Sequence, residues 1–245
     1  MKILKLKEQI EKYIPYNEQE VSDKELMLEY IDKFEDVLTR KNKMCHFTAS
    51  NWIVNKDRTK VLMIYHNIYK SWAWTGGHAD GDSNLLHVAI KEAEEETGLN
   101  KLKLLSDGIY GLQILTVDSH IKRGKFISSH LHLDCCFLLE ANEEEKLRIK
   151  EDENSGVKWV EIYKATKLTN EEMMKSIYAK LNSKLKTIKT QDWYGKIISK
   201  TLKNNYNFDI VQLRIGIGIA MGNTLQEVKK QSKEITLSND NDGIT

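Results

Sequence analysis

The sequence has little of the residues that mark several large classes of protein. Its 245 residues include one proline, Pro15, and thirteen glycines, which excludes a collagen-like, linker-rich or low-complexity chain. Lys and Arg number 37 against 36 Asp and Glu, so no excess of one charge indicates a nucleic-acid or acidic-membrane surface. We therefore expect no membrane partner and no general nucleic-acid binding.

Cysteine and long hydrophobic runs are scarce as well. The three cysteines, Cys45, Cys135 and Cys136, form no CxxC motif, and adjacent residues of a strand point to opposite faces. No apolar run could cross a bilayer, and Lys and Glu interrupt the apolar residues of 1–14, so we expect no signal peptide. Together these features predict reduced thiols in a cytoplasmic protein.

The pattern of apolar residues predicts a strand-rich domain with helices on both sides of it in the chain. Helical spacing over 5–41, broken by a turn at 15–17, predicts two amphipathic helices. One central helix is expected over 85–97, capped by Asp82 or Ser83 and ended by Gly98. Strands are predicted at 46–55, 60–67, 71–77, 108–117, 128–141 and 156–162. Beyond 168, helices are predicted at 171–188 and 193–203, followed by a βαβ unit.

Three carboxylates give the central helix its chemical interest. Glu92, Glu95 and Glu96 are spaced i, i+3 and i+4, so they share one arc of the helix beside an apolar arc that can pack on a sheet. Such like charges repel unless cations neutralise them. Hard divalent cations such as Mg²⁺ or Mn²⁺ prefer oxygen ligands and activate phosphate chemistry. The preceding Gly76-Gly77 lets the backbone turn sharply and place a carbonyl beside the carboxylates.

The same segment resembles the Nudix box, G-x5-E-x7-R-E-U-x-E-E-x-G-U, where U is a bulky aliphatic residue. The spacing agrees throughout, with Gly77, Lys91-Glu92-Ala93, Glu95-Glu96 and Gly98-Leu99 at the box positions. Ser83 and Lys91 replace the usual Glu and Arg, which in the family mainly brace the loop on the helix. The runs HFTASNWIV and GGHADGD further resemble a bacterial Nudix subgroup with an N-terminal helical extension.

This resemblance implies a fold, a reaction and a set of site residues. The fold is a Nudix-type α/β/α sandwich with a mixed sheet, N-terminal helices and a C-terminal helical plus βαβ appendage. The reaction is the Mg²⁺- or Mn²⁺-dependent hydrolysis of a diphosphate linkage in a nucleoside diphosphate joined to another moiety. Glu92, Glu95 and Glu96 are the implied catalytic residues, and the same three with Gly77 are the implied metal ligands. We expect a helical extension over 1–45, the Nudix domain over 46–168, a helical segment over 169–204 and a βαβ fragment over 205–245.

Several alternatives remain at this point. The acidic run could be a solvated helix face, and a Nudix domain can be catalytically silent. A non-hydrolytic nucleotide sensor would bind nucleotides in the same cleft without releasing a monophosphate. The proton acceptor could be a box glutamate, or Glu151, Glu153 or Glu161 beside the last predicted strand.

Other residues are candidates for substrate binding. His130 and His132 share one face of a predicted strand, while His66 and His78 lie near strand ends that could face the same cleft and touch a phosphate or a metal. Trp74 could stack on a base, although core packing is the more common role for a tryptophan in such a strand.

The last thirty residues carry a second resemblance. Residues 216–245, beginning GIGIAMGN, are similar to the end of haloacid-dehalogenase-type phosphatases of the Cof kind. The nucleophile motif DxDGT of that family has only an imitation at 240–245, where the sequence given stops, and its GDxxND motif keeps only Asp209. We therefore predict a non-catalytic fragment, whose apolar strands make a homo-oligomer conceivable.

Overall fold

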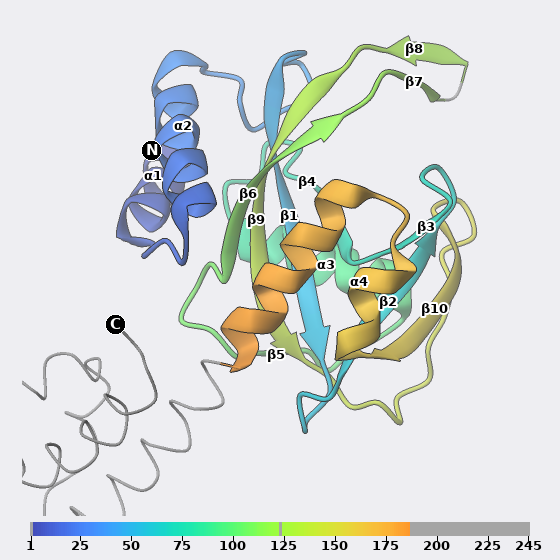
Figure 1. Ribbon diagram of the computed structural model, residues 1–245. Helices are drawn as coiled ribbons and strands as arrows, with labels where there is room; N and C mark the ends of the chain where they lie inside the picture. The colour runs from blue at the N-terminus through green and yellow to red at the C-terminus, as the bar shows by residue number, and fades with distance from the viewer. Residues whose placement is uncertain (1, 123, 187–245) are drawn as a thin grey trace, which may run out of the picture. The chain divides into compact units, whose positions relative to one another are not determined.

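A computed structural model of the protein describes residues 2–122 and 124–186 (Figure 1). Its centre is a mixed eight-stranded sheet in which β1 (Cys45–Val54) lies between β2 (Lys60–His66) and β9 (His130–Glu140). β1 and β9 run parallel, and the other pairs in the sheet are antiparallel. The sheet is completed by β3 (Ser71–Ala73), β4 (Thr75–His78), β5 (Lys103–Leu104), β6 (Gly111–Val117) and β10 (Asn154–Glu161).

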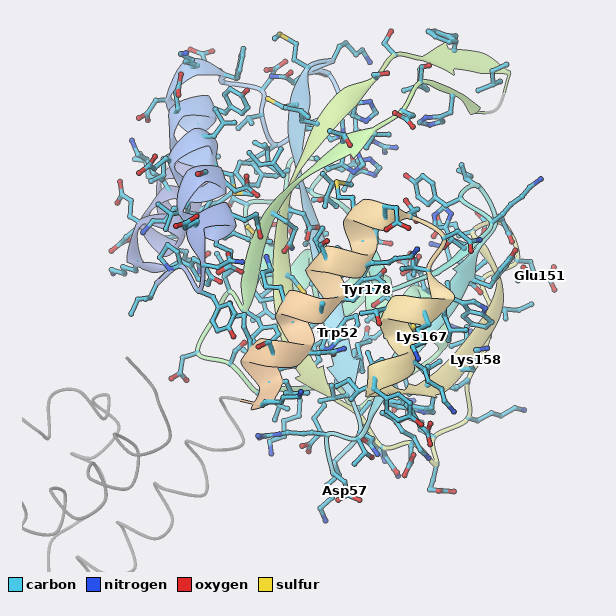
Figure 2. The ribbon with its side chains drawn as sticks, viewed as in Figure 1. Trp52, Asp57, Glu151, Lys158, Lys167 and Tyr178 are labelled. Atoms are coloured by element: carbon cyan, nitrogen blue, oxygen red, sulfur yellow. The ribbon has the colours of Figure 1, made fainter. Side chains whose placement is uncertain are left out.

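Helices cover both faces of this sheet. α3 (Leu85–Thr97) lies behind the sheet in Figure 1, and the helix of residues 172–186 crosses in front of it. Phe47 and Ala49 of β1 belong to the core that the α3 residues complete. On the opposite face Trp52 packs against Tyr178, with ring centroids 4.9 Å apart (Figure 2). The predicted α/β/α sandwich with a mixed sheet is confirmed.

The N-terminal segment forms two helices, as expected, but the second is shorter than predicted. α1 (Lys2–Lys12) and α2 (Glu18–Lys33) are separated by a turn, and the side chain of Asn17 caps α2 by accepting from the Glu20 N–H at 3.0 Å. Helical spacing predicted a helix as far as residue 41. α2 ends instead at Lys33, because the chain beyond it turns toward β1. Val37 is buried there, and its carbonyl accepts from the Phe47 N–H at 2.8 Å.

Two further predictions need correction. The expected strand over 71–77 is two strands, because the chain passes at Trp74 from β3, which pairs with β2, to β4, which pairs with β1. The N-cap of α3 is Asn84 and not Asp82 or Ser83: its side chain accepts from the His87 N–H at 3.3 Å. The predicted C-terminal end of α3 is confirmed, since Gly98 ends this helix with φ at 78°.

Sequence patterns did not predict every element. A hairpin of β7 (His120–Lys122) and β8 (Lys125–Ile127) extends from the ends of β6 and β9, and η1 (Ile162–Lys164) and α4 (Ala165–Leu168) follow β10 (Figure 1). The predicted helix over 193–203 and the βαβ unit lie outside the described residues. Among the helices described, none is long and apolar enough to span a membrane.

Candidate active site

Two of the three box carboxylates meet the double glycine of β4, where α3 packs against that strand. Glu96 Oε2 accepts a hydrogen bond from the Gly76 N–H at 3.0 Å. A Cβ atom on Gly77 would lie 2.6 Å from Glu92 Oε1, so only glycine leaves room for this carboxylate. Glu95, one residue before Glu96, is half exposed at the rim. The structure therefore brings the predicted ligand residues Glu92, Glu96 and Gly77 into direct proximity.

Burial makes the ionised cluster costly without a cation. Glu96 is only 2% exposed, and burial raises its pKa well above the usual value although the Gly76 N–H opposes that shift. Burial also raises the pKa of Glu92. The negative charge of Glu92 further raises the pKa of Glu96, and that of Glu95 further raises the pKa of Glu92. Both carboxylates thus favour either a proton or a positive partner.

Lys150 supplies part of that positive charge. Its Nζ lies 2.9 Å from Glu95 Oε2 and 3.1 Å from Glu153 Oε2, while Lys91 Nζ lies 3.5 Å from the other Glu95 oxygen. The hydrogen bond from Lys150 lowers the pKa of Glu95. Sequence reasoning missed Lys150, because it belongs to no motif and the chain folds it onto the cluster from the segment before β10.

The three acids proposed outside the box occupy different places. Glu153 carries a charge that raises the pKa values of Glu92 and Glu96, so it faces the cluster. Glu161 lies at the far end of β10 and pairs with Lys164 Nζ at 2.7 Å. Glu151 lies at the outer edge of the molecule in Figure 2. Only Glu153 of these three joins the carboxylate site.

The predicted histidines fall into two groups. His78, His130 and His132 come together on one sheet face, joined by His46, which the sequence analysis did not single out. Burial lowers the pKa of His46. His66 lies elsewhere, at the turn after β2: its Nδ1 accepts from the backbone N–H groups of residues 68 and 69.

Trp74 packs against the helix of residues 172–186. It is half-buried, its ring lies edge-on to Tyr178 at 5.6 Å, and its backbone N–H donates to the Tyr178 hydroxyl at 3.1 Å. These contacts give Trp74 a packing role, and its predicted part in substrate binding stays a prediction.

The sequence matches the NUDIX domain profile over residues 45–181, more than half of the chain. The chain belongs to the Nudix family. The match confirms the resemblance seen in the box and the expectation of a Nudix-type hydrolase domain. Residues 213–245 match the haloacid dehalogenase-like hydrolase family, as the second resemblance implied, and they lie outside the described part of the chain.

Solved structures similar to this Nudix protein include three hydrolases. A Caenorhabditis elegans Ap4A hydrolase in a binary complex is 21% identical, covering 59% of this chain and 97% of its own, with a TM-score of 0.43. A NUDIX family hydrolase from Clostridium perfringens is 22% identical over 57% and 97%, also with a TM-score of 0.43. The Escherichia coli dihydroneopterin triphosphate pyrophosphohydrolase is 16% identical over 55% and 92%, with a TM-score of 0.43. A search of curated proteins finds no match.

The loop of this Nudix box is braced although the usual Glu is absent at Ser83. Arg40, from the N-terminal segment, donates two hydrogen bonds to the Asp80 carboxylate at 2.7 and 2.6 Å. Asp82 contacts His87 Nδ1 at 2.8 Å and so links the loop to α3. The N-terminal segment therefore contributes to the rigidity that Ser83 was expected to weaken.

Proposed function

We propose that this Nudix domain hydrolyses a diphosphate linkage in a nucleoside diphosphate joined to another moiety, and that it depends on Mg²⁺ or Mn²⁺. One observation carries the proposal: the buried Glu96 and the half-buried Glu92 meet the double glycine of β4, where Glu92 leaves no space for a Cβ atom on Gly77. Carboxylates that repel one another at such close range are expected where a cation binds between them. Membership of the Nudix family supports the choice of substrate class.

The residues at the site fit a hard divalent cation. The available donors are oxygens, supplied by Glu92, Glu95, Glu96 and the Gly77 carbonyl. Mg²⁺ and Mn²⁺ prefer such ligands to nitrogen or sulfur. A cation held by these residues would polarise the phosphoanhydride and make water a better nucleophile near neutral pH. The raised pKa values of Glu92 and Glu96 mean that their affinity for the cation increases with pH.

We assign two tasks to residues at the edge of the cluster. Glu153 accepts the proton of the attacking water, because it is the outside acid whose charge acts on the cluster. Lys150 holds Glu95 and Glu153 in place through its ion pairs of 2.9 and 3.1 Å. Loss of Lys150 would remove no metal ligand but would leave the Glu95 and Glu153 carboxylates without their shared ion-pair partner, so we regard it as a positioning residue.

A product assay tests the proposed reaction. The full chain is incubated with Mg²⁺ and, separately, with a dinucleotide, a nucleotide sugar, a nucleoside triphosphate and capped RNA, and the products are separated by anion exchange. Release of a nucleoside monophosphate from at least one dinucleotide or nucleotide sugar supports the proposal. Tight nucleotide binding without any product would instead identify a non-hydrolytic sensor.

The cysteines support a cytoplasmic location. Cys45, Cys135 and Cys136 are free and buried, so none pairs in a disulfide. Burial raises the pKa of the Cys45 thiol to about 11, which keeps it protonated and unreactive at neutral pH. Free thiols of this kind are typical of proteins in a reducing compartment.

A further inference from the structure

Four of the seven histidines gather on one face of the sheet. His46 on β1 is the register partner of His132 on the parallel strand β9, and His130 lies two residues earlier on the same face. The His46 ring centroid lies 5.0 Å from those of His130 and His132. His78 on β4 adds a fourth ring, 4.9 Å from that of His132. Adjacent strands therefore present a compact group of imidazoles.

The ring nitrogens of three of these residues have the spacing of metal ligands. One nitrogen each from His46, His130 and His132 lies within 4.8 Å of the others. The Nε2 atoms of His130 and His132 are 3.1 Å apart. Two nitrogens bound tetrahedrally to Zn²⁺ are about 3.3 Å apart, given Zn–N bonds of roughly 2.0–2.1 Å. Two of the three ligand atoms thus already have about this separation, and the third, on His46, lies within 4.8 Å of both.

Backbone carbonyls orient two of the rings for metal binding. His130 Nδ1 lies 2.8 Å from the Ser128 carbonyl, and His46 Nδ1 lies 3.2 Å from the Asn42 carbonyl. A carbonyl oxygen only accepts, so each Nδ1 carries a proton, and Nε2 is the ring nitrogen left to bind a metal. This is the outer-shell arrangement that metal-binding histidines commonly have.

His46 provides the independent observation that points to a ligand. His46 is only 4% exposed, and its Nε2 atom is buried with no hydrogen-bond partner. A buried acceptor without a partner costs free energy unless something binds it. A metal ion between the three rings would satisfy this lone pair.

We propose that His46, His130 and His132 bind one transition-metal ion of the Zn²⁺ class, with water or a rotated His78 as the fourth ligand. Imidazole nitrogen suits Zn²⁺, Co²⁺, Ni²⁺ and Cu²⁺ and not Mg²⁺, so this site differs in selectivity from the carboxylate cluster. The ion joins β1 to β9 beside β4, which carries Gly77 one residue before His78. Binding therefore stabilises the sheet next to the catalytic glycines.

Zinc titration of the full chain tests this proposal. Protein stripped with EDTA is titrated with Zn²⁺ against a chromophoric chelator, with Mg²⁺ in large excess to occupy the carboxylates. We expect one equivalent of Zn²⁺ to bind and to raise the melting temperature, and Co²⁺ in its place to give the intense visible absorption of a tetrahedral site. His130→Gln and His132→Gln, both at partly exposed positions, should each weaken Zn²⁺ binding by about 100-fold or more.

Two control variants separate this site from other sources of zinc affinity. His120→Gln removes a histidine of β7 outside the cluster, and Glu92→Gln disables the carboxylate cluster; both should keep wild-type Zn²⁺ affinity. Circular dichroism checks that each variant is folded. Unchanged affinity in His130→Gln and His132→Gln, or its loss in Glu92→Gln, would overturn the proposal. Absence of Zn²⁺ binding, with thermal stabilisation by inorganic phosphate at low pH, would show that the rings bind an anion instead.

Discussion

Glu96 combines deep burial with a charge that the proposed function requires. Burial raises its pKa above that of an unfolded glutamate, so in the absence of a cation the folded protein loses stability as the pH rises through that raised value. Below the unfolded pKa the group is neutral in both states and the penalty disappears. At neutral pH a bound divalent cation would instead make the ionised Glu96 stabilise the folded protein.

Glu96→Gln should expose this linkage. In EDTA the variant should melt several degrees above the wild type at about pH 8, and the difference should vanish near pH 4.5. With Mg²⁺ at about pH 8, the wild type should gain stability and the variant should not. Thermal melts across that pH range, with and without Mg²⁺, give all three comparisons. A variant less stable than the wild type in EDTA at the higher pH would contradict the account.

The two glycines of β4 should respond differently to a methyl group. In Gly77→Ala the added Cβ meets the flexible Glu92 carboxylate at 2.6 Å, whereas in Gly76→Ala it meets the Ala49 carbonyl oxygen at 2.6 Å. We expect Gly77→Ala to lose activity about 10-fold or more with little loss of stability, because a ligand is displaced. Gly76→Ala should cost about 1–3 kcal/mol of unfolding free energy, because backbone must move. Urea denaturation and initial rates measure both, and equal stability in the two variants would contradict the geometry.

At the scale of elements, a buried charge cluster joins α2 to the helix of residues 172–186. Glu20, fully buried, lies 3.0 Å from Lys180 Nζ and 3.3 Å from Lys184 Nζ, and it accepts from the Tyr13 hydroxyl at 2.6 Å. Burial raises the pKa of Glu20, but the two lysines and the hydrogen bonds outweigh it and the net shift is downward. The stability from this cluster is thus present at neutral pH and is lost as the pH falls through the lowered pKa.

Glu20→Gln should therefore be strongly destabilising. It leaves the buried Lys180 and the partly buried Lys184 without their counter-charge, and we expect a loss of about 3 kcal/mol at neutral pH that diminishes in acid. Glu8→Gln is the matched control, since Glu8 pairs with Lys12 on the surface and its loss should leave the unfolding free energy almost unchanged. Urea unfolding at two pH values measures both variants. If Glu20→Gln lost as little stability as Glu8→Gln, the buried charge cluster would contribute little to the unfolding free energy.

The elements also show what local sequence can predict. The box helix was predictable because its apolar arc, its carboxylate spacing and Gly98 all indicate the same bounds. The end of α2 was not, because helical spacing continues past Lys33 while the buried Val37 bonds to β1, a partner distant in sequence. The division of 71–77 at Trp74 likewise depends on two different neighbouring strands.

The candidate site was predictable to a similar extent. Glu92, Glu96 and Gly77 belong to one continuous motif, so their proximity follows from the spacing. Lys150 and His46 reach their places only through the packing of remote segments, and neither carries a motif. The sequence therefore predicted the motif residues and missed those that tertiary structure adds.

At the scale of the whole molecule, the described unit should suffice for catalysis. Residues up to Leu185 form one compact unit, and it contains every residue assigned to the carboxylate site. A shortened chain ending at Lys189 should keep the diphosphatase activity of the full chain. The full chain should not cleave p-nitrophenyl phosphate, because the phosphatase-like segment lacks its nucleophile motif. Phosphomonoesterase activity that survives Glu96→Gln but is lost on shortening would contradict this division of roles.

The central claim is that specific carboxylates of α3, and not its acidity in general, hold the divalent cation. Glu92→Gln and Glu94→Gln remove the same charge two residues apart, one from the cluster at Gly77 and one from the exposed face of the helix. The most direct test is the Mg²⁺ dependence of hydrolysis in these two variants, with the substrate that the wild type cleaves. We expect Glu92→Gln to lose about 100-fold or more in rate and Glu94→Gln to retain the wild-type rate and Mg²⁺ response. Equal rates in the two variants would contradict the assignment.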